Sequence, residues 1–260
     1  MLVSRRGRVP GWFALSLLVG IGATVAATLP LGSSSVLAAG PHAVSASTLL
    51  RNACKASFAA SAFHVKGHLT SGGETISLDV YFGSSGDLMT ATEKGDQTFH
   101  VIENGPSVYM KANRAFWLAN SNNNRALASL VADRWIDMTS DKKDTAGITK
   151  SLTKKTFFGG ACSSNYFGGG SASYAGNATI HGVKVFVVHQ SHVKSPGTFF
   201  IENGPTPYIL RGMGTSQNDG GVLTFSNYGV QPDTSAPRGA IDFSQLSGNS
   251  GNSANSGNSG

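Results

Sequence analysis

The sequence predicts a mainly antiparallel β fold with a few helices, the α+β class. Over Glu74–Phe82, apolar and polar residues alternate strictly, which is typical of a strand with one apolar face. Similar short runs recur along much of the chain, and Gly, Asn and Asp mark turns between them. A helical period appears only near the start and in the middle of the chain. We therefore expect one large sheet with one apolar face, and the function depends on what that face covers.

The composition indicates one exported domain with a weakly charged surface. Hydrophobic residues make up 40% of the 260 residues, which is enough for a core, whereas charged residues make up only 13%, against about 25% in a typical protein. The surface must therefore rely on Ser, Thr, Asn and Gly. Setting aside residues 1–39 and 247–260 leaves a single domain over 40–246, of a size usual for one core.

Residues 1–39 have the layout of a secretory signal peptide. Arg5, Arg6 and Arg8 form the basic flank, an apolar run covers residues 12–29, and small residues before Gly40 offer a cleavage site. The alternative is an uncleaved membrane anchor, because the apolar run is nearly long enough to span a bilayer. Both alternatives imply export, so we expect the protein to be secreted or held in the cell envelope.

The charge of the domain itself does not indicate a nucleic-acid partner. The leader holds three of the basic residues and no acid, so its removal lowers the formal charge from +6 to +3. The remaining basic residues form no cluster beyond the pairs Lys142-Lys143 and Lys154-Lys155. The final segment 247–260 contains almost only Asn, Ser and Gly, a composition that predicts a disordered tail.

Cys54 and Cys162 are the only cysteines. An even number of cysteines in an exported chain favours a disulfide, so we expect these two to pair. The alternative is two separate buried thiols, because the sequence does not give the distance between the two Cα atoms.

The first half of the domain is expected to be a helix followed by a meander of five strands. The helix starts at Ser45 or Ser47, either of which suits an N-cap, and places an apolar stripe on one face. Its stripe consists of Leu49, Leu50, Ala53, Cys54, Ser57 and Phe58. The five strands are expected at Ala62–Thr70, Glu74–Phe82, Leu88–Lys94, Gln97–Glu103 and Val108–Met110.

The second half begins with helices and returns to strands. One helix is expected around Leu127–Val131 and another around Ile148–Thr156, with Trp135 and Ile136 packing against the sheet between them. A glycine-rich loop is expected over Phe158–Gly170. Strands follow at Ala178–Ile180, Val183–His189, Thr198–Glu202, Pro207–Arg211 and Val222–Tyr228.

A short string occurs twice, as Ile102-Glu-Asn-Gly-Pro106 and as Ile201-Glu-Asn-Gly-Pro205. Asn-Gly is the preferred pair for a tight hairpin, and Pro is tolerated where a strand begins. The flanking residues show no further similarity, so we interpret the match as two turns that converged rather than as a duplication.

The sequence shows no motif for catalysis, metal binding or nucleotide binding. His189 and His192 have no neighbouring carboxylate or Cys to complete a metal site, and no serine-hydrolase elbow or phosphate-binding loop is present. His64 and His68 share a strand face with Lys66, which indicates a solvent-facing side. Paired carboxylates serve in glycosidases, but we interpret the acids of this chain as solvated charges: Glu74, Asp79, Asp133, Asp137 and Glu202. We expect no enzyme activity, no metal and no cofactor.

The order of elements resembles the LppX/LprG family of actinobacterial cell-envelope lipoproteins, which have a LolA-like fold. The resemblance rests on the exported leader, the strand around Ser61–Gly67, the meander ending at Val108–Lys111, the helical middle with Arg134-Trp135-Ile136, and the closing stretch Leu223–Gly229 with Ile241-Asp242. It implies a curved, half-open β-barrel closed by helices around an apolar cavity. These lipoproteins are usually anchored through a lipid-modified Cys after the leader, but no Cys precedes Cys54 here. We therefore expect release, or retention by an uncleaved leader.

The resemblance implies a carrier that binds a lipid or lipidated molecule and transports it through the envelope, with membrane contact that is transient or made by an uncleaved leader. A delivery partner is implied but not identified. Alternating apolar residues are the predicted lipid contacts: Ile76, Leu78, Val80, Phe82, Val108, Met110, Val185 and Val187. The alternative is a structural or surface-interaction protein of the same fold, with its interior filled by side chains such as Phe157, Phe158 and Phe167.

Overall fold

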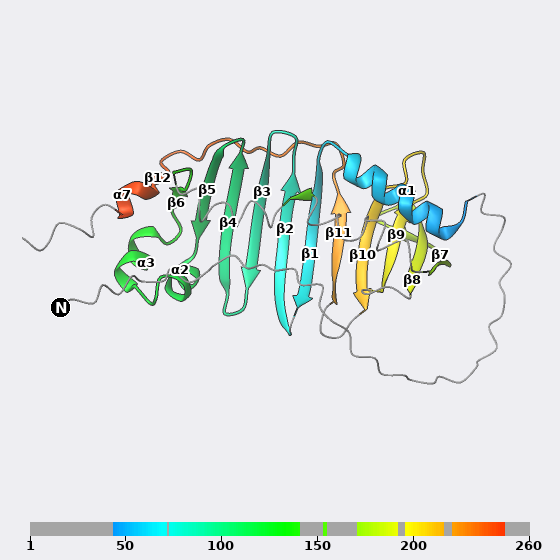
Figure 1. Ribbon diagram of the computed structural model, residues 1–260, viewed down its shortest axis with the longest axis horizontal. Helices are drawn as coiled ribbons and strands as arrows, with labels where there is room; N and C mark the ends of the chain where they lie inside the picture. The colour runs from blue at the N-terminus through cyan, green and yellow to red at the C-terminus, as the bar shows by residue number, and fades with distance from the viewer. Residues whose placement is uncertain are drawn as a thin grey trace, which may run out of the picture.

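The alternating runs form one 12-stranded sheet with the strand order β12-β6-β5-β4-β3-β2-β1-β11-β10-β9-β8-β7 in the computed structural model (Figure 1). The structure describes residues 44–71, 73–140, 153–154, 171–191, 196–215 and 220–247. The predicted leader, nearly all of the tail, most of the helix expected at Ile148–Thr156, the glycine-rich loop and Cys162 lie outside these residues.

The sheet consists of two meanders joined side by side. The first contains β1 (Phe63–Ser71), β2 (Glu74–Phe82), β3 (Gly86–Glu93), β4 (Gln97–Asn104), β5 (Ser107–Ala112) and β6 (Trp135–Asp137). The short strand β12 (Ile241–Asp242) pairs in parallel with β6 at its outer edge. The second contains β7 (Ser171–Ile180), β8 (Val183–Ser191), β9 (Gly197–Glu202), β10 (Ile209–Thr215) and β11 (Gly220–Ser226). Antiparallel pairing of β1 with β11 forms the seam between them. The strand order is not circular, so the curved sheet stays open, which confirms the predicted mainly antiparallel, half-open architecture.

The register defines two faces of the sheet. The inner face carries the residues aligned with Phe63 and Val65 of β1, and the outer face carries those aligned with His64 and Lys66. An apolar row crosses seven strands on the inner face, and all its members are at most 7% exposed. In strand order its members are Phe225, Val65, Val80, Met89, Val101, Met110 and Ile136. This row is the centre of the core.

The described helices are α1 (Ala46–Ala59), α2 (Arg114–Asn120), α3 (Arg125–Val131) and α7 (Phe243–Ser247). In α1, Ser45 caps the first turn through Thr48 N, and the predicted apolar stripe faces the sheet. Phe58 is the exception, since it is 46% exposed. Figure 1 shows α1 across the second meander, whereas α2 and α3 lie at the far side of the first.

Three predictions of local structure need correction. Trp135 and Ile136 do not plug the sheet but form β6, with Ile136 paired to Met110. The sequence did not predict α2, which Asn113 caps by accepting a hydrogen bond from Phe116 N at 2.9 Å. The strand expected at Pro207–Arg211 begins later, at Ile209.

Glycines allow the two meanders to meet closely at the seam. A Cβ at Gly67 of β1 would lie 1.9 Å from the carbonyl oxygen of Val222, and one at Gly221 of β11 would lie 2.2 Å from that of His68. Gly221 also has a φ of +144°, which L side chains rarely adopt. Only glycine fits either position, and glycines of this kind let a sheet bend sharply.

Candidate functional site

Six of the eight predicted lipid contacts lie together on the inner face. Ile76, Leu78, Val80 and Phe82 follow one another along β2, and Val108 and Met110 lie on β5. Five of them are at most 7% exposed, and Ile76 is half-buried. Strict alternation in these strands made the inner residues recognisable from sequence.

Val185 and Val187 lie on the outer face. On β8, the neighbours Phe186 and Val188 belong to the core, and Val187 pairs with Phe200, which in turn pairs with Arg211 on the outer face. β8 is apolar on both faces around this point, so alternation did not distinguish them. These two residues do not share a cavity with the other six.

The inner face is sealed at one end of the strands. Phe63 and Phe82 are 1% and 0% exposed, with ring centroids 4.9 Å apart. Tyr228 packs against Phe63 at 5.9 Å and donates a hydrogen bond to the carbonyl oxygen of Ile209 at 2.6 Å. Burial raises the pKa of Tyr228, so its hydroxyl keeps its proton and continues to donate. Ser57 of α1 accepts from Ile209 N at 3.0 Å, which fixes the helix over this end.

At the other end, the inner face is less covered and lacks side chains. Leu69 and Ile76 are only half-buried there. The next three positions across the sheet are glycines: Gly221 on β11, Gly214 on β10 and Gly197 on β9. Phe199 and Leu223, both half-buried, border this glycine strip. The arrangement forms an apolar surface that is closed at the aromatic end and accessible at the glycine end.

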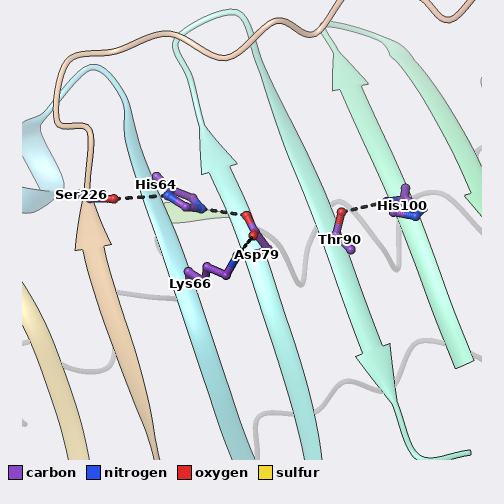
Figure 2. Close-up of polar contacts among 6 residues, drawn as sticks. All are labelled: His64, Lys66, Asp79, Thr90, His100 and Ser226. Atoms are coloured by element: carbon purple, nitrogen blue, oxygen red, sulfur yellow. Dashed lines mark hydrogen bonds and ion pairs between the residues drawn. The ribbon is translucent and has the colours of Figure 1, made fainter. Parts of the chain in front are cut away.

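The outer face of β1, β2 and β11 carries a connected polar network (Figure 2). His64 Nε2 lies 2.7 Å from Asp79 Oδ1, and His64 Nδ1 lies 3.2 Å from Ser226 Oγ. Lys66 Nζ holds the second carboxylate oxygen of Asp79 at 2.8 Å. Partial burial raises the pKa of Asp79, but hydrogen bonds from Lys66 and His64 outweigh it and hold that pKa below its usual value.

The order Ser226, His64, Asp79 is that of a hydrolase triad, but the surroundings favour a structural role. Ser226 and His64 are direct cross-strand partners, and the His64 ring stacks on Tyr81 at 3.8 Å. A serine nucleophile also needs N–H donors arranged for an oxyanion, and the contacts described around Ser226 show no such pair. The sequence predicts a polar face for His64 and Lys66 but not the network, because the register that brings Asp79 beside them has no local signal in the sequence.

A hollow of about 670 Å³ adjoins this network on the outer face, between β1, β11 and the turn that joins β7 to β8. Within the described residues, no group of three or more His, Cys, Asp or Glu side chains is arranged to hold a metal ion. None of the described helices combines the length and apolar character needed to cross a membrane.

Comparison with known proteins gives likeness of fold alone. No protein-family model and no curated protein matches the sequence. The crystal structure of the lipoprotein LppX from Mycobacterium tuberculosis is 15% identical, with 73% of this chain and 97% of that chain covered and a TM-score of 0.48. LprF from Mycobacterium bovis is 14% identical, with 74% and 96% covered and a TM-score of 0.48.

A LolA superfamily protein from Nitrosomonas europaea is 12% identical, with 73% of this chain and 94% of that chain covered and a TM-score of 0.26. These similarities, all at low identity, are to the LppX/LprG-like and LolA-like proteins that the sequence resembles.

Proposed function

We propose that this protein is an exported, non-enzymatic carrier that holds a lipid or lipidated molecule against the inner face of its sheet. The observation that carries the proposal is the asymmetry of that face, which is sealed by aromatic residues at one end and lined by half-buried apolar residues and glycines at the other. Each buried methylene of an acyl chain contributes about 0.8 kcal/mol, so such a surface binds a chain without any catalytic group.

The contacts follow from exposure. Leu69, Ile76, Phe199 and Leu223 are apolar but only half-buried, so a bound chain would remove further apolar surface from water. Val80 and Phe82 are already fully buried, so they form the floor beneath the ligand rather than its main contacts. Gly197, Gly214 and Gly221 add no side chain to this surface, because neighbouring backbone lies where a Cβ would stand.

One buried donor also supports a lipid with an ester or amide group. Trp117 of α2 packs against the core, and its Nε1 is buried without a hydrogen-bond partner among the described residues. A buried donor without an acceptor costs about 1–3 kcal/mol. A carbonyl oxygen of a bound lipid would satisfy it.

Lipid extraction from the purified mature protein, followed by native mass spectrometry and titration with a fluorescent fatty-acyl probe, tests the proposal. We expect a copurifying lipid and saturable probe binding. Ile76→Asp should weaken probe binding at least tenfold, whereas Ser77→Asp, on the outer face of the same strand, should leave it unchanged. Absence of both lipid and probe uptake would support the filled-core alternative, and equal effects of the two variants would remove the inner face from the site.

The non-enzymatic part of the proposal has its own test. A fluorophosphonate probe labels activated serines, and it should leave Ser226 unmodified at a concentration that labels a control serine hydrolase completely. Labelling of Ser226 that disappears in His64→Ala would instead assign a nucleophile to the outer-face network.

A further inference from the structure

The outer-face hollow has one polar wall and one apolar wall. Its polar wall comes from β1 and β11 and consists of His64, Lys66, Thr224, Ser226 and Asn227. Its apolar wall comes from Ile180 and Val183 at the β7–β8 turn and from Leu210 on β10. Val183 is 37% exposed although it is a large apolar residue, so this wall presents apolar surface to solvent. The hollow lies on the face opposite the proposed lipid site.

Two cationic side chains flank the polar wall. In register, Lys66 of β1 pairs with Thr224 of β11, and Thr224 pairs with Arg211 of β10. Since neighbouring strands lie about 4.8 Å apart, the Cα atoms of Lys66 and Arg211 are about 10 Å apart. Lys66 lines the hollow and Arg211 does not, so an anion in the hollow would lie at Lys66, beside the hydroxyl of Thr224.

The N–H donors of Arg211 and Lys66 are only partly used by contacts within the described residues. The guanidinium of Arg211 lies 5.8 Å from the ring centroid of Phe200, and its Nε is buried without a hydrogen-bond partner among the described residues. Lys66 is 68% exposed and contacts Asp79 on one side only. Arg211 leans toward β9 and does not line the hollow, whereas Lys66 lines it and has N–H donors beyond its contact with Asp79, so an anion in the hollow would bind at Lys66.

The nearby acids do not oppose an anion equally. Both carboxylate oxygens of Asp79 already accept from cationic or ring N–H groups, those of Lys66 and His64. Glu202 lies on the outer face of β9, in register with Val185, but it does not line the hollow. His181, which does line it, adds a further donor at the β7–β8 turn.

We propose that this hollow is a second binding site, for an amphiphilic anion. Its phosphate or carboxylate head lies at Lys66, beside the hydroxyls of Thr224 and Ser226. Its short apolar tail lies against Ile180, Val183 and Leu210. The proposal does not depend on lipid binding at the inner face, because the two surfaces are on opposite sides of the sheet.

The test compares inorganic phosphate with hexyl phosphate by amide chemical-shift perturbation in the full mature chain. Hexyl phosphate should shift the amides of Thr224, Ser226 and Val183 in a saturable manner. It should bind at least tenfold more tightly than inorganic phosphate, because each methylene that leaves water contributes about a fourfold gain. Shifts confined to inner-face amides, or no saturable shifts, would overturn the proposal.

Matched variants locate the head and the tail. Lys66→Met should weaken hexyl phosphate binding at least tenfold, and Val183→Asp should do the same by repelling the head and removing tail contact. Lys111→Met removes the same charge on the outer face of β5, away from the hollow, and should leave the affinity unchanged. Both Lys66 and Val183 are exposed, so these variants should fold. Equal losses in Lys66→Met and Lys111→Met would reduce the interaction to general charge attraction and overturn the site.

Vesicles distinguish the two sources of such an anion. Cosedimentation with phosphatidylglycerol vesicles that weakens in Lys66→Met would place the head group in a membrane lipid. Binding of hexyl phosphate without cosedimentation would assign the site to a soluble organic anion. Ile76→Asp should change neither result, so loss of inner-face lipid binding remains distinguishable from loss of this site.

Discussion

The two meanders differ in how they cover the inner face. The first turns tightly, keeps its register throughout β1–β5, and fills the inner face with side chains such as Val80, Met89 and Val101. The second contains two register shifts, at Tyr174/Gly176 and at Ile209/Arg211, and places glycines on its inner face. Helix α1 crosses the second meander, whereas the short helix α2 packs against β4 of the first. The first meander therefore acts as the packed wall, and the second meander with α1 offers the space.

The repeated string shows that local sequence alone does not cause this difference. In the first meander, Ile102-Glu-Asn-Gly-Pro106 forms a tight turn, with Asn104 paired to Ser107 and Gly105 at a φ of +56°. In the second, the same residues form a wider connection, which closes through a 2.8 Å hydrogen bond from Glu202 N to the carbonyl oxygen of Tyr208, next to the pair Ile201 and Ile209. The flanking residues decide the outcome, which agrees with convergence of two turns.

The largest expected effect contrasts the sealed and the accessible ends of the inner face. Phe82→Ala removes a ring that is fully buried, so it should lower the free energy of unfolding by about 3–5 kcal/mol. Leu223→Ala, at the half-buried end, should lower the free energy of unfolding by only about 1–2 kcal/mol. It should weaken acyl-probe binding more than Phe82→Ala does. Urea unfolding and probe titration measure both quantities. A larger stability loss in Leu223→Ala would contradict the assignment of the two ends.

The predicted disulfide would link α1, the helix that covers the second meander, to Cys162. Cys54 of α1 is 1% exposed, and Cys162 lies outside the described residues. We expect no thiol to react with iodoacetamide in denatured, unreduced protein. Closing a loop of roughly 110 residues should stabilise the fold by about 2–4 kcal/mol, measured as the difference between the wild type and the double variant Cys54→Ala/Cys162→Ala. Alkylation of both cysteines before reduction would refute the bond.

The sequence predicted the first meander far better than the second. Between Phe63 and Ala112, strict alternation and tight turns determine both the strands and their inner residues. In β8, apolar residues occupy both faces, so Val185 and Val187 were assigned to the lipid site although they face outward. Long-range registry, such as the approach of Asp79 to His64 or of Arg211 to Thr224, depends on pairing between distant strands and leaves no local signal.

The hold of α1 on the second meander depends on one buried hydroxyl. Ser57 is 0% exposed and accepts from Ile209 N. Ser57→Ala leaves that N–H unsatisfied and should cost about 1–3 kcal/mol, while speeding hydrogen exchange at Ile209. Ser47→Ala, on the same helix, is the control and should change the free energy of unfolding by less than about 0.5 kcal/mol. Unchanged exchange at Ile209 in Ser57→Ala would mean that α1 is held by apolar packing alone.

The smallest expected effect concerns two acids at the rim of the first meander. Asp87 and Glu103 are cross-strand partners, and burial raises the pKa of each carboxyl. For a raised acid pKa, the folded state binds more protons than the unfolded state, so stability falls as pH rises from the unfolded pKa through the folded pKa. Asp87→Asn should therefore raise the free energy of unfolding at pH 7 by about 0.5 kcal/mol, and the gain should shrink toward pH 4.

Two other acids of the same sheet supply a control variant and a variant with the opposite pH dependence. Asp96→Asn, in the exposed turn between β3 and β4, is the control and should change the free energy of unfolding at pH 7 by less than about 0.5 kcal/mol. Asp79 acts in the opposite direction, because its lowered pKa supplies stability that is present above the unfolded pKa and lost as pH falls through the folded pKa. Asp79→Asn should thus flatten the acid limb, whereas Asp87→Asn should flatten the slope at higher pH. If both variants altered the same limb of the pH profile, the pKa values of Asp87 and Asp79 would not be shifted in opposite directions. The electrostatic contrast between the rim and the outer face would then be wrong.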